Sequence, residues 1–435
     1  MKTVALIPAK LWDGDSSVTE SGKAVLISGR RIRGVCPLAD IPVDAECVDL
    51  SGCTLLPGLV DSHVHYLECS GPLFLAAGVT TVRDTGNDLD WILQQREKNE
   101  LDTIRGPRIR CCGRALDGPD GIWNEIVQHH NDNNGLLHAI RDHVNRGVDQ
   151  IKLYAGINAD MLRVGVDEAH TNGKHTLAHL NETTAHTAID VGLDEVEHFS
   201  RCDVAWREAL GHEDDQLVDR ILAKGTIMNP TLVVWDRLGR ALEHTFLYDS
   251  RRRWIHPELL DIWERFPYRR LHEENRRLRF QLAMPHLKRF LLRCHQRDVV
   301  IGAGTDNPFI HLIPGFSLHD ELALYVDAGW APVKALRAAT RVNAKIVGLD
   351  GEVGRICADM DADLVAVKGD PLKRIDDLGS VVMVMRSGDR LSIDGLYKRA
   401  QDMFNQPLQD PMFCDLKRYV NGEMPAYSQK GGDRE

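Results

Sequence analysis

The segment LLPGLVDSHVHYLE, residues 55–68, places three polar side chains at the end of an apolar run. Side chains alternate between the two faces of a strand, so Asp61, His63 and His65 point to one face and the residues between them to the other. Two imidazoles on one face of a strand offer two nitrogen ligands to a single metal ion. The two histidines would also fit a solvated loop that follows a short buried strand. The rest of the chain has to decide between a metal site and such a loop.

Composition narrows the classes of function. The 435 residues are 43% hydrophobic, which is enough for a large core. They include 53 Lys and Arg against 64 Asp and Glu, a net charge of −11. This acidic balance argues against a nucleic acid or an anionic membrane as the partner, and we expect a small-molecule substrate.

The cysteines and the N-terminus indicate a compartment. The ten cysteines are scattered, without a CxxC pair, as expected for reduced thiols. No apolar run reaches the roughly 18 residues that span a bilayer. The N-terminal MKTVALIPAKLWDGD lacks the apolar region and cleavage site of a signal peptide. We therefore expect a cytoplasmic protein.

Downstream of the quoted segment, short β-branched strands alternate with amphipathic helical stretches. Eight such strands lie across residues 59–306, and they predict an α/β fold, a closed (β/α)8 TIM-like barrel over residues 59–345. An open doubly wound sheet is the alternative, but no glycine-rich fingerprint follows the first strand. Strand patterns also occupy residues 1–58 and 346–400, so both ends should fold together as a small sheet domain. We expect the polar residues 401–435 to form a loosely held tail.

Three more strands of the predicted barrel end in residues that bind metals. Reactive groups in a (β/α)8 barrel sit at the carboxyl ends of the strands. The strand in HTLAH ends at His179, the strand in DEVEH at His198 and the strand in VVIGAGTD at Asp306. Each alone fits a structural role, a helix N-cap for the aspartate or a hydrogen-bonded core imidazole for either histidine. Together with the first two histidines they predict a metal site at one end of the barrel.

Lys152 adds a second indication of metal chemistry. In VDQIKLYAG, alternation turns Ile151 and Leu153 toward the helices and Lys152 and Tyr154 toward the barrel interior. An unpaired ammonium group there would carry a heavy desolvation cost. The lysine could form a salt bridge, or it could react with CO₂ to give a carbamate that bridges two divalent cations. Imidazole, carbamate and carboxylate ligands suit Zn²⁺ above all, with Mn²⁺, Fe²⁺ or Co²⁺ as alternatives.

The motifs LLPGLVDSHVH, AGVTTVRDTG, IKLYAG, VEHF, GTD and ATRVNAKIVGL resemble the amidohydrolase superfamily. They are most similar to its imidazolonepropionase-like branch, which includes Xaa-Pro dipeptidases (prolidases) and ochratoxin-hydrolysing enzymes. The resemblance implies a distorted (β/α)8 barrel with a β-sandwich built from both termini. It also implies a metal-dependent amidohydrolase that cleaves an amide or peptide C–N bond of a small substrate, a dipeptide or an N-acyl amino acid.

The resemblance further implies a metal shell of six residues: His63, His65, carboxylated Lys152, His179, His198 and Asp306. The first two histidines and the aspartate would hold one ion and the other two histidines the second, with the lysine as the bridge. A hydroxide between the ions would be the nucleophile, since a zinc centre lowers the pKa of bound water to about 7. Asp306 would accept its proton and deliver it to the leaving nitrogen.

The substrate-binding residues are less defined. The segments CGRALDGPDGIW and LNETTAH depart from the pattern of many relatives, which leaves the substrate open. Tyr154 could hydrogen-bond the substrate or only cap the barrel, and Arg83 could meet a substrate carboxylate or form a buried ion pair. Asn229, in MNPTLVV, resembles a residue of a relative's seventh strand and should line the pocket. The helical insert at 236–295 could act as a lid or as an oligomer contact.

Two other functions stay open. A mononuclear deaminase or cyclic-amide (imidazolone-type) hydrolase would share the fold but typically lacks the bridging lysine. A non-catalytic scaffold with the amidohydrolase fold would have lost ligands, whereas every expected ligand is present here. Relatives tend to be oligomeric, so we expect a homo-oligomer.

Overall fold

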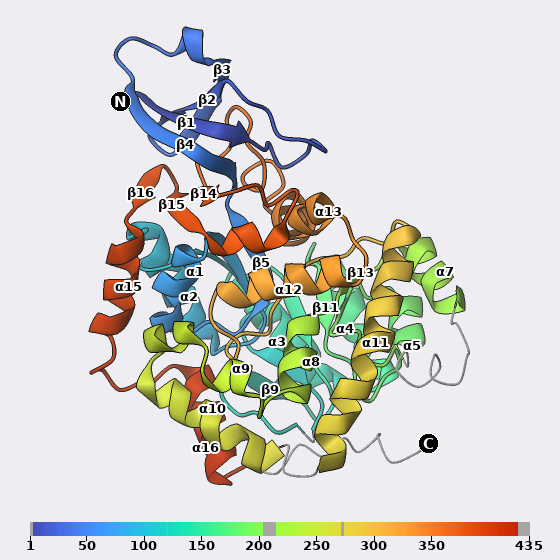
Figure 1. Ribbon diagram of the computed structural model, residues 1–435. Helices are drawn as coiled ribbons and strands as arrows, with labels where there is room; N and C mark the ends of the chain where they lie inside the picture. The colour runs from blue at the N-terminus through green and yellow to red at the C-terminus, as the bar shows by residue number, and fades with distance from the viewer. Residues whose placement is uncertain (1–2, 120, 203–214, 271–273, 425–435) are drawn as a thin grey trace.

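The computed structural model describes residues 3–119, 121–202, 215–270 and 274–424. A sheet built from both ends of the chain lies above a barrel that is surrounded by helices (Figure 1). Within the described ranges, no helix combines the length and the apolar character needed to cross a membrane.

Strands from the two ends of the chain form one mixed sheet, with the order β16-β15-β14-β4-β1-β2-β3. The strands are β1 (Thr3–Leu11), β2 (Lys23–Ser28), β3 (Arg31–Pro37), β4 (Glu46–Pro57), β14 (Leu364–Lys368), β15 (Val381–Arg386) and β16 (Asp389–Leu391). β4 joins the two ends, because it pairs in parallel with β1 and antiparallel with β14. Leu6, Leu55 and Leu364 share one buried core. The expectation that both ends fold together is confirmed.

The barrel strands form two parallel groups. The first group consists of β5 (Leu59–Val64), β6 (Val79–Asp84) and β7 (Arg108–Cys111). The second has the order β13-β12-β11-β10-β8-β9, with β8 (Ala115–Asp117), β9 (Val127–His129), β10 (Ile151–Leu153), β11 (Thr176–Ala178), β12 (Glu195–Glu197) and β13 (Ile227–Asn229). The ring of strands is divided between β7 and β8, where Gly113 has a φ of +71°. This division distorts the barrel.

The eighth segment closes the ring without forming a regular strand. Its contacts are isolated parallel bridges, from Ile301 to Met228 of β13 and from Asn307 to Val64 of β5. The segment lies so close to β5 that a Cβ at Gly304 would be 2.5 Å from the Cβ of His63. The (β/α)8 prediction is therefore confirmed as a distorted barrel, with glycine permitting the close approach that closes it.

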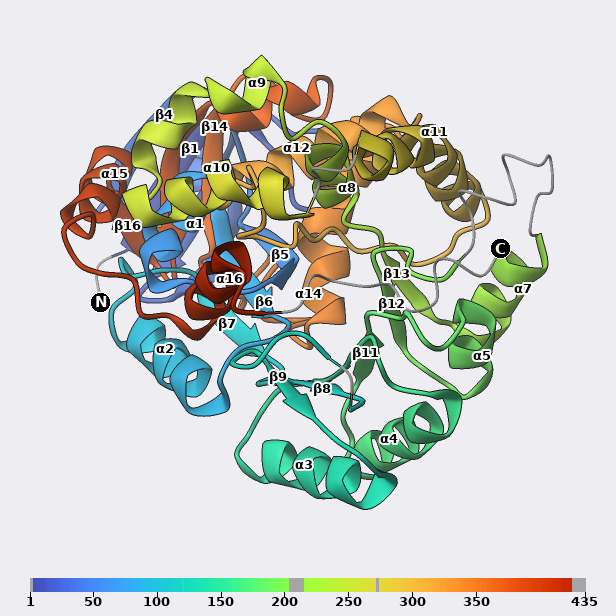
Figure 2. The ribbon, with the colours of Figure 1, turned by 90° about the horizontal axis from the view of Figure 1, so that it is seen from below.

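Helices cover the outside of the strands, and Figure 2 shows several of them as an arc around the barrel. They are α1 (Gly71–Ala76), α2 (Leu89–Leu101), α3 (Asn133–Asn145), α4 (Ala159–Thr171), α5 (Ala185–Asp190), α7 (Asp215–Lys224), α12 (Phe316–Asp327), α13 (Pro332–Arg337) and α14 (Asn343–Ile346). Local sequence starts many of them: Asp132 caps α3 by accepting from the Gly135 N–H, and Asn158 caps α4. The predicted insert forms α8 (Leu232–Gly239), α9 (His244–Leu247), α10 (Pro257–Arg270) and α11 (Glu274–Gln296).

The C-terminal segment differs from the loosely held tail expected over 401–435. α15 (Ile393–Asp402) is followed by α16 (Pro411–Asn421), which packs against α10. Met412, Leu416 and Tyr419 of α16 are almost completely buried. The expectation of a loose tail is wrong for α16, because its apolar residues recur at helical spacing and form one buried face. Residues 425–435 lie outside the described part of the chain.

Candidate metal centre and substrate pocket

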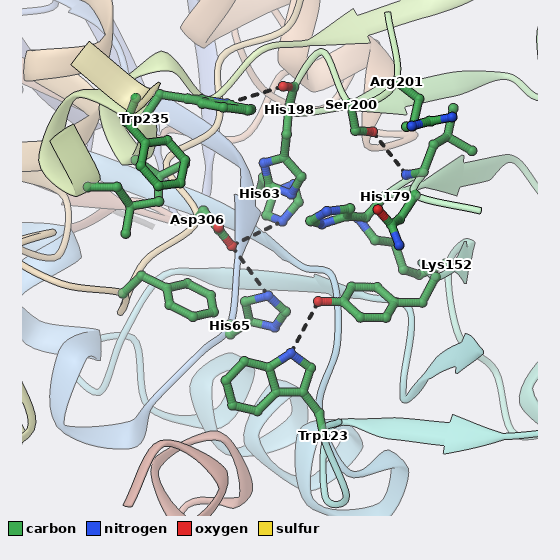
Figure 3. Close-up of a pocket in the computed structure, with 17 residues that line it drawn as sticks. His63, His65, Trp123, Lys152, His179, His198, Ser200, Arg201, Trp235 and Asp306 are labelled. Carbon is green, nitrogen blue, oxygen red and sulfur yellow. Dashed lines mark hydrogen bonds and ion pairs between the residues drawn. The ribbon is translucent and has the colours of Figure 1, made fainter. Parts of the chain in front are cut away.

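All six predicted metal ligands line a single pocket at the carboxyl ends of the barrel strands (Figure 3). His63 and His65 end β5, Lys152 lies in β10, His179 follows β11, His198 follows β12 and Asp306 ends the eighth segment. Parallel strands bring their carboxyl ends to one edge, so residues far apart in sequence meet there.

The side chains approach one another closely enough to share cations. The Nε2 atoms of His63 and His65 each lie 3.4 Å from Oδ1 of Asp306. The ring of His198 lies 4.6 Å from that of His63 and 4.5 Å from that of His179, measured between centroids. One ligand atom each from His63, His198 and Asp306 fall within 4.8 Å of one another. This trio spans the two ligand sets that the family resemblance implied.

Three of the histidines are oriented by a second protein group. The Nδ1 partners are Glu197 Oε2 for His63 (2.6 Å), the Gly86 carbonyl for His65 (2.8 Å) and the Thr231 hydroxyl for His198 (2.6 Å). With Nδ1 engaged, each imidazole has Nε2 left for the pocket. Such partners are typical of histidines that bind metals, because they set the tautomer and the ring orientation.

The charge states favour cation binding. Burial, together with the neighbouring His179, lowers the pKa of His198 well below its usual value, so this imidazole is neutral. Burial opposes ionisation of Asp306, but its close neighbour His198 and hydrogen bonds from His63 and His65 hold its pKa well below the usual value. Burial also disfavours charge on His63, but Glu197 outweighs it and raises the pKa of His63. The same carboxylate would attract a metal cation.

Two of the ligands have left-handed backbone, which is rare for residues other than glycine. The φ angles are +62° at His198 and +63° at Asp306. Backbone hydrogen bonds hold both: the His198 N–H donates to the Asn229 carbonyl (2.7 Å), and the Asp306 N–H donates to the His63 carbonyl (2.8 Å). Strain of this kind persists where surrounding structure enforces it, and it clusters at functional sites.

Lys152 lines the pocket, and its ammonium group has no polar partner in the part of the chain that the structure describes. The residue is 1% exposed, and its Nζ has no hydrogen bond and no ion pair with any residue that the structure describes. Burial lowers the pKa of Lys152. The structural alternative, a salt bridge to a neighbouring carboxylate, is therefore not observed in the described residues.

Arg83 does not reach the pocket, so the expectation that it meets a substrate carboxylate is wrong. The side chain is fully buried, and both terminal nitrogens lie 2.7 Å from Glu195. One of them also donates to Glu197 Oε1 at 3.0 Å. The alternative, a buried ion pair, is correct. Arg83 holds Glu197, which in turn holds His63.

Asn229 and Tyr154 were both predicted as pocket residues, and of these two only Tyr154 is among the described residues that line the pocket. Asn229 is fully buried, its Nδ2 donates to the Ser62 hydroxyl at 3.0 Å, and it is absent from the described residues that line the pocket. Its expected place in the lining is not observed, and its Oδ1 lies 3.0 Å from where a Cβ at Gly304 would stand. Tyr154 does line the pocket, where its hydroxyl accepts from the Trp123 indole at 3.2 Å and its ring lies 5.2 Å from that of His179.

An apolar wall completes the pocket, and the sequence showed no sign of it. The wall consists of Trp123, Val234, Trp235, Leu238, Phe280 and Phe309. Two of these residues, Leu238 and Phe280, belong to the predicted insert, which therefore contributes side chains to the pocket. Ser200 and Arg201, just after β12, line the pocket as well. The signal that could have found Arg201 is its place three residues after the ligand His198.

The chain belongs to the amidohydrolase family, whose match covers residues 72–391. It is therefore a hydrolase that acts on amide bonds. The matched range includes Lys152, His179, His198 and Asp306, and it begins after the first two histidine ligands. None of the curated proteins matches the chain.

Solved structures share the fold at low sequence identity. A Xaa-Pro dipeptidase with methionine bound in its active site is 21% identical, with a TM-score of 0.70 over 90% of this chain and 100% of that one. The ochratoxinase of A. niger is 20% identical, with a TM-score of 0.70 over 90% and 96% of the two chains. A bottromycin amidohydrolase is 20% identical, with a TM-score of 0.73 over 94% and 92%. These similarities establish the fold.

Proposed function

We propose that this protein is a metal-dependent amidohydrolase that cleaves the C–N bond of a dipeptide or N-acyl amino acid with two divalent cations, most naturally Zn²⁺. The observation that carries the proposal is the convergence of four imidazoles, one carboxylate and one buried lysine in a single pocket, the lysine having no polar partner among the described residues. Nitrogen and oxygen donors of this kind suit zinc. A Xaa-Pro dipeptidase and a bottromycin amidohydrolase with the same fold support the choice of substrate.

The surroundings of Lys152 fit a carbamate. Burial lowers its pKa, which favours the neutral amine, the form that attacks CO₂. The amine and CO₂ give a carbamate and release one proton. The carbamate is negatively charged, and each of its two oxygen atoms could bind a cation. We propose that His63, His65 and Asp306 hold one cation and that His179 and His198 hold the other, with Lys152 between them.

The protein's own residues then have defined tasks. The bound cations would supply Lewis acidity, which lowers the pKa of water and polarises the scissile carbonyl. Asp306 is ionised and lies in hydrogen-bond reach of the ligand imidazoles, so it can accept the proton of the attacking water and return it to the leaving nitrogen. Three of the imidazoles are held in position beside that carboxylate by hydrogen bonds at Nδ1, with Glu197, Gly86 and Thr231 as the partners.

The test is metal content per chain, measured by elemental analysis on protein purified without chelators and with bicarbonate. We expect two equivalents in the wild type and fewer in Lys152→Met, with amide hydrolysis lost in the variant. Methionine removes a buried amine that lacks a hydrogen-bond partner among the described residues, so the metal-free variant should be at least as thermally stable as the metal-free wild type. Lys224→Met, at the exposed end of α7, is the matched control.

Other outcomes would select the other functions. One equivalent that survives the loss of Lys152 would favour a mononuclear deaminase or cyclic-amide hydrolase. If no metal is bound, and none binds after addition of zinc or manganese, the non-catalytic scaffold would be the remaining function.

Location and assembly belong to the same proposal. All ten cysteines lie within the described residues and are free thiols, which fits the reducing cytoplasm. We also propose a homo-oligomer and a small-molecule substrate, with neither nucleic acid nor membrane as a partner.

A further inference from the structure

Arg201 brings a positive charge to the pocket, and no acidic group among the described residues neutralises it. Its side chain lines the same pocket as the metal ligands. Its Nε is buried without a hydrogen-bond partner, and no carboxylate of the described residues forms an ion pair with its guanidinium. Arg83, by contrast, has two buried glutamates. A buried donor left unpaired costs free energy, so an arginine of this kind indicates a ligand that supplies the acceptor.

Arg201 lies in a turn whose backbone is held in place. The turn after β12 is left-handed at His198, Phe199 and Arg201, with φ of +62°, +50° and +53°. The Ser200 hydroxyl donates to the Glu197 carbonyl (2.8 Å) and accepts from the backbone N–H that follows His179 (2.9 Å). The backbone position of Arg201 is thus fixed by the turn that also carries the metal ligand His198, in the way strained functional segments are maintained.

The pocket has two chemically different ends. In Figure 3, Arg201 lies on one side of the histidine ligands, and Asp306 and Trp235 lie on the other. Trp235 belongs to the apolar wall, with Trp123 and Phe309 nearby in the lining. A molecule held across the ligands would therefore extend a negatively charged end toward Arg201 and an apolar end toward the wall.

We propose that Arg201 binds the free carboxylate of the amino-acid part of the substrate, while an apolar or aromatic acyl part rests on the wall. This inference rests on the proposed hydrolysis of amides and names its substrate class more closely. The planar guanidinium offers paired N–H donors that match both oxygens of a carboxylate. Arg201 is thus a residue that determines specificity, and it takes the role that Arg83 cannot perform.

The test compares an acid with its neutral amide: N-benzoylglycine and N-benzoylglycinamide. For the metal-loaded wild type we expect the acid to bind at least tenfold more tightly in calorimetric titration and to be hydrolysed with the lower KM. Arg201→Gly removes the side chain and suits the left-handed backbone, so the variant should fold. In this variant, KM for the acid should rise roughly 10- to 100-fold with little change in kcat, and the amide should be unaffected. The KM of Arg201→Lys for the acid should lie between the KM of the wild type and that of Arg201→Gly.

Arg141→Met, which breaks an exposed ion pair with Glu168, is the control and should behave as the wild type. Equal binding of acid and amide by the wild type, or an equal loss of both in Arg201→Gly, would overturn the role of Arg201. Failure of the proposed hydrolysis gives a different result: the acid would still bind through Arg201, but neither compound would be cleaved.

Discussion

The ligand side of the pocket is made by strands, and the apolar wall facing it is made by loops and helices. His63 and His65 continue β5, and Lys152 lies within β10, where hydrogen bonds to neighbouring strands set each position. Trp123 lies in the loop between β8 and β9, and Trp235 in α8. The ligand side depends on the register of the barrel, whereas the wall depends on how distant segments pack.

Trp123 is held in place by a helix from the far end of the chain, α16. Asp415 of α16 accepts the backbone N–H groups of Asn124, Glu125 and Ile126 at 2.8–3.2 Å. Tyr419 of the same helix lies 5.6 Å from the Trp123 ring. The C-terminal helix therefore holds one part of the substrate wall without touching the metal ligands. Chemistry and specificity can change independently when they are built on different elements.

The largest effect is expected on the ligand side, from Asp306→Asn. Asparagine keeps the size and tolerates the left-handed backbone, but it cannot take up a proton. We expect kcat to fall by about 10³-fold or more, since general acid–base catalysis contributes roughly 10²–10⁴-fold. Steady-state kinetics and metal content would be measured together. Retention of more than a tenth of the activity would contradict the assigned role.

A smaller effect, confined to substrate binding, is expected from Asp415→Asn on the wall side. The three backbone N–H groups share Oδ2, so the amide replaces a charged acceptor by a neutral one and turns an NH₂ group toward the Asn124 N–H, a loss of about 1–3 kcal/mol in the free energy of unfolding. KM should rise several-fold while metal content stays unchanged. Asp402→Asn, on the exposed face of α15, is the control. A loss of metal in Asp415→Asn would mean that the two sides are not separable.

The smallest effect is a pH dependence of stability, with no expected effect on turnover. Asp410, just before α16, accepts the Glu68 N–H at 2.8 Å, and burial raises its pKa to about 6. Since the folded state then binds the proton more tightly than the unfolded chain, the contribution to stability is full below about pH 4 and is lost as the pH rises through 6.

Asp410→Asn stays neutral and keeps the acceptor oxygen. Its unfolding free energy should match that of the wild type near pH 4 and exceed it at pH 8 by about 3 kcal/mol. Denaturant unfolding at the two pH values measures this difference. A constant difference at both values would show that Asp410 is not the titrating group.

Local pattern was sufficient for the ligand side. Alternation along a strand assigns a face to each residue, and parallel strands share one carboxyl edge, so the four histidines, Lys152 and Asp306 could be predicted to meet. The union of both chain ends in one sheet followed from their strand patterns. These features depend on short segments whose periodicity is visible in the sequence.

Long-range packing decided the rest. Whether an arginine is buried in an ion pair or open to a ligand depends on its neighbours in space: Arg83 meets Glu195, 112 residues away, whereas Arg201 meets no acid among the described residues. The same holds for Trp123, which is positioned by Asp415 from the far end of the chain. Side-chain partners of this kind have no periodic signature, because they arise only after distant elements have packed together.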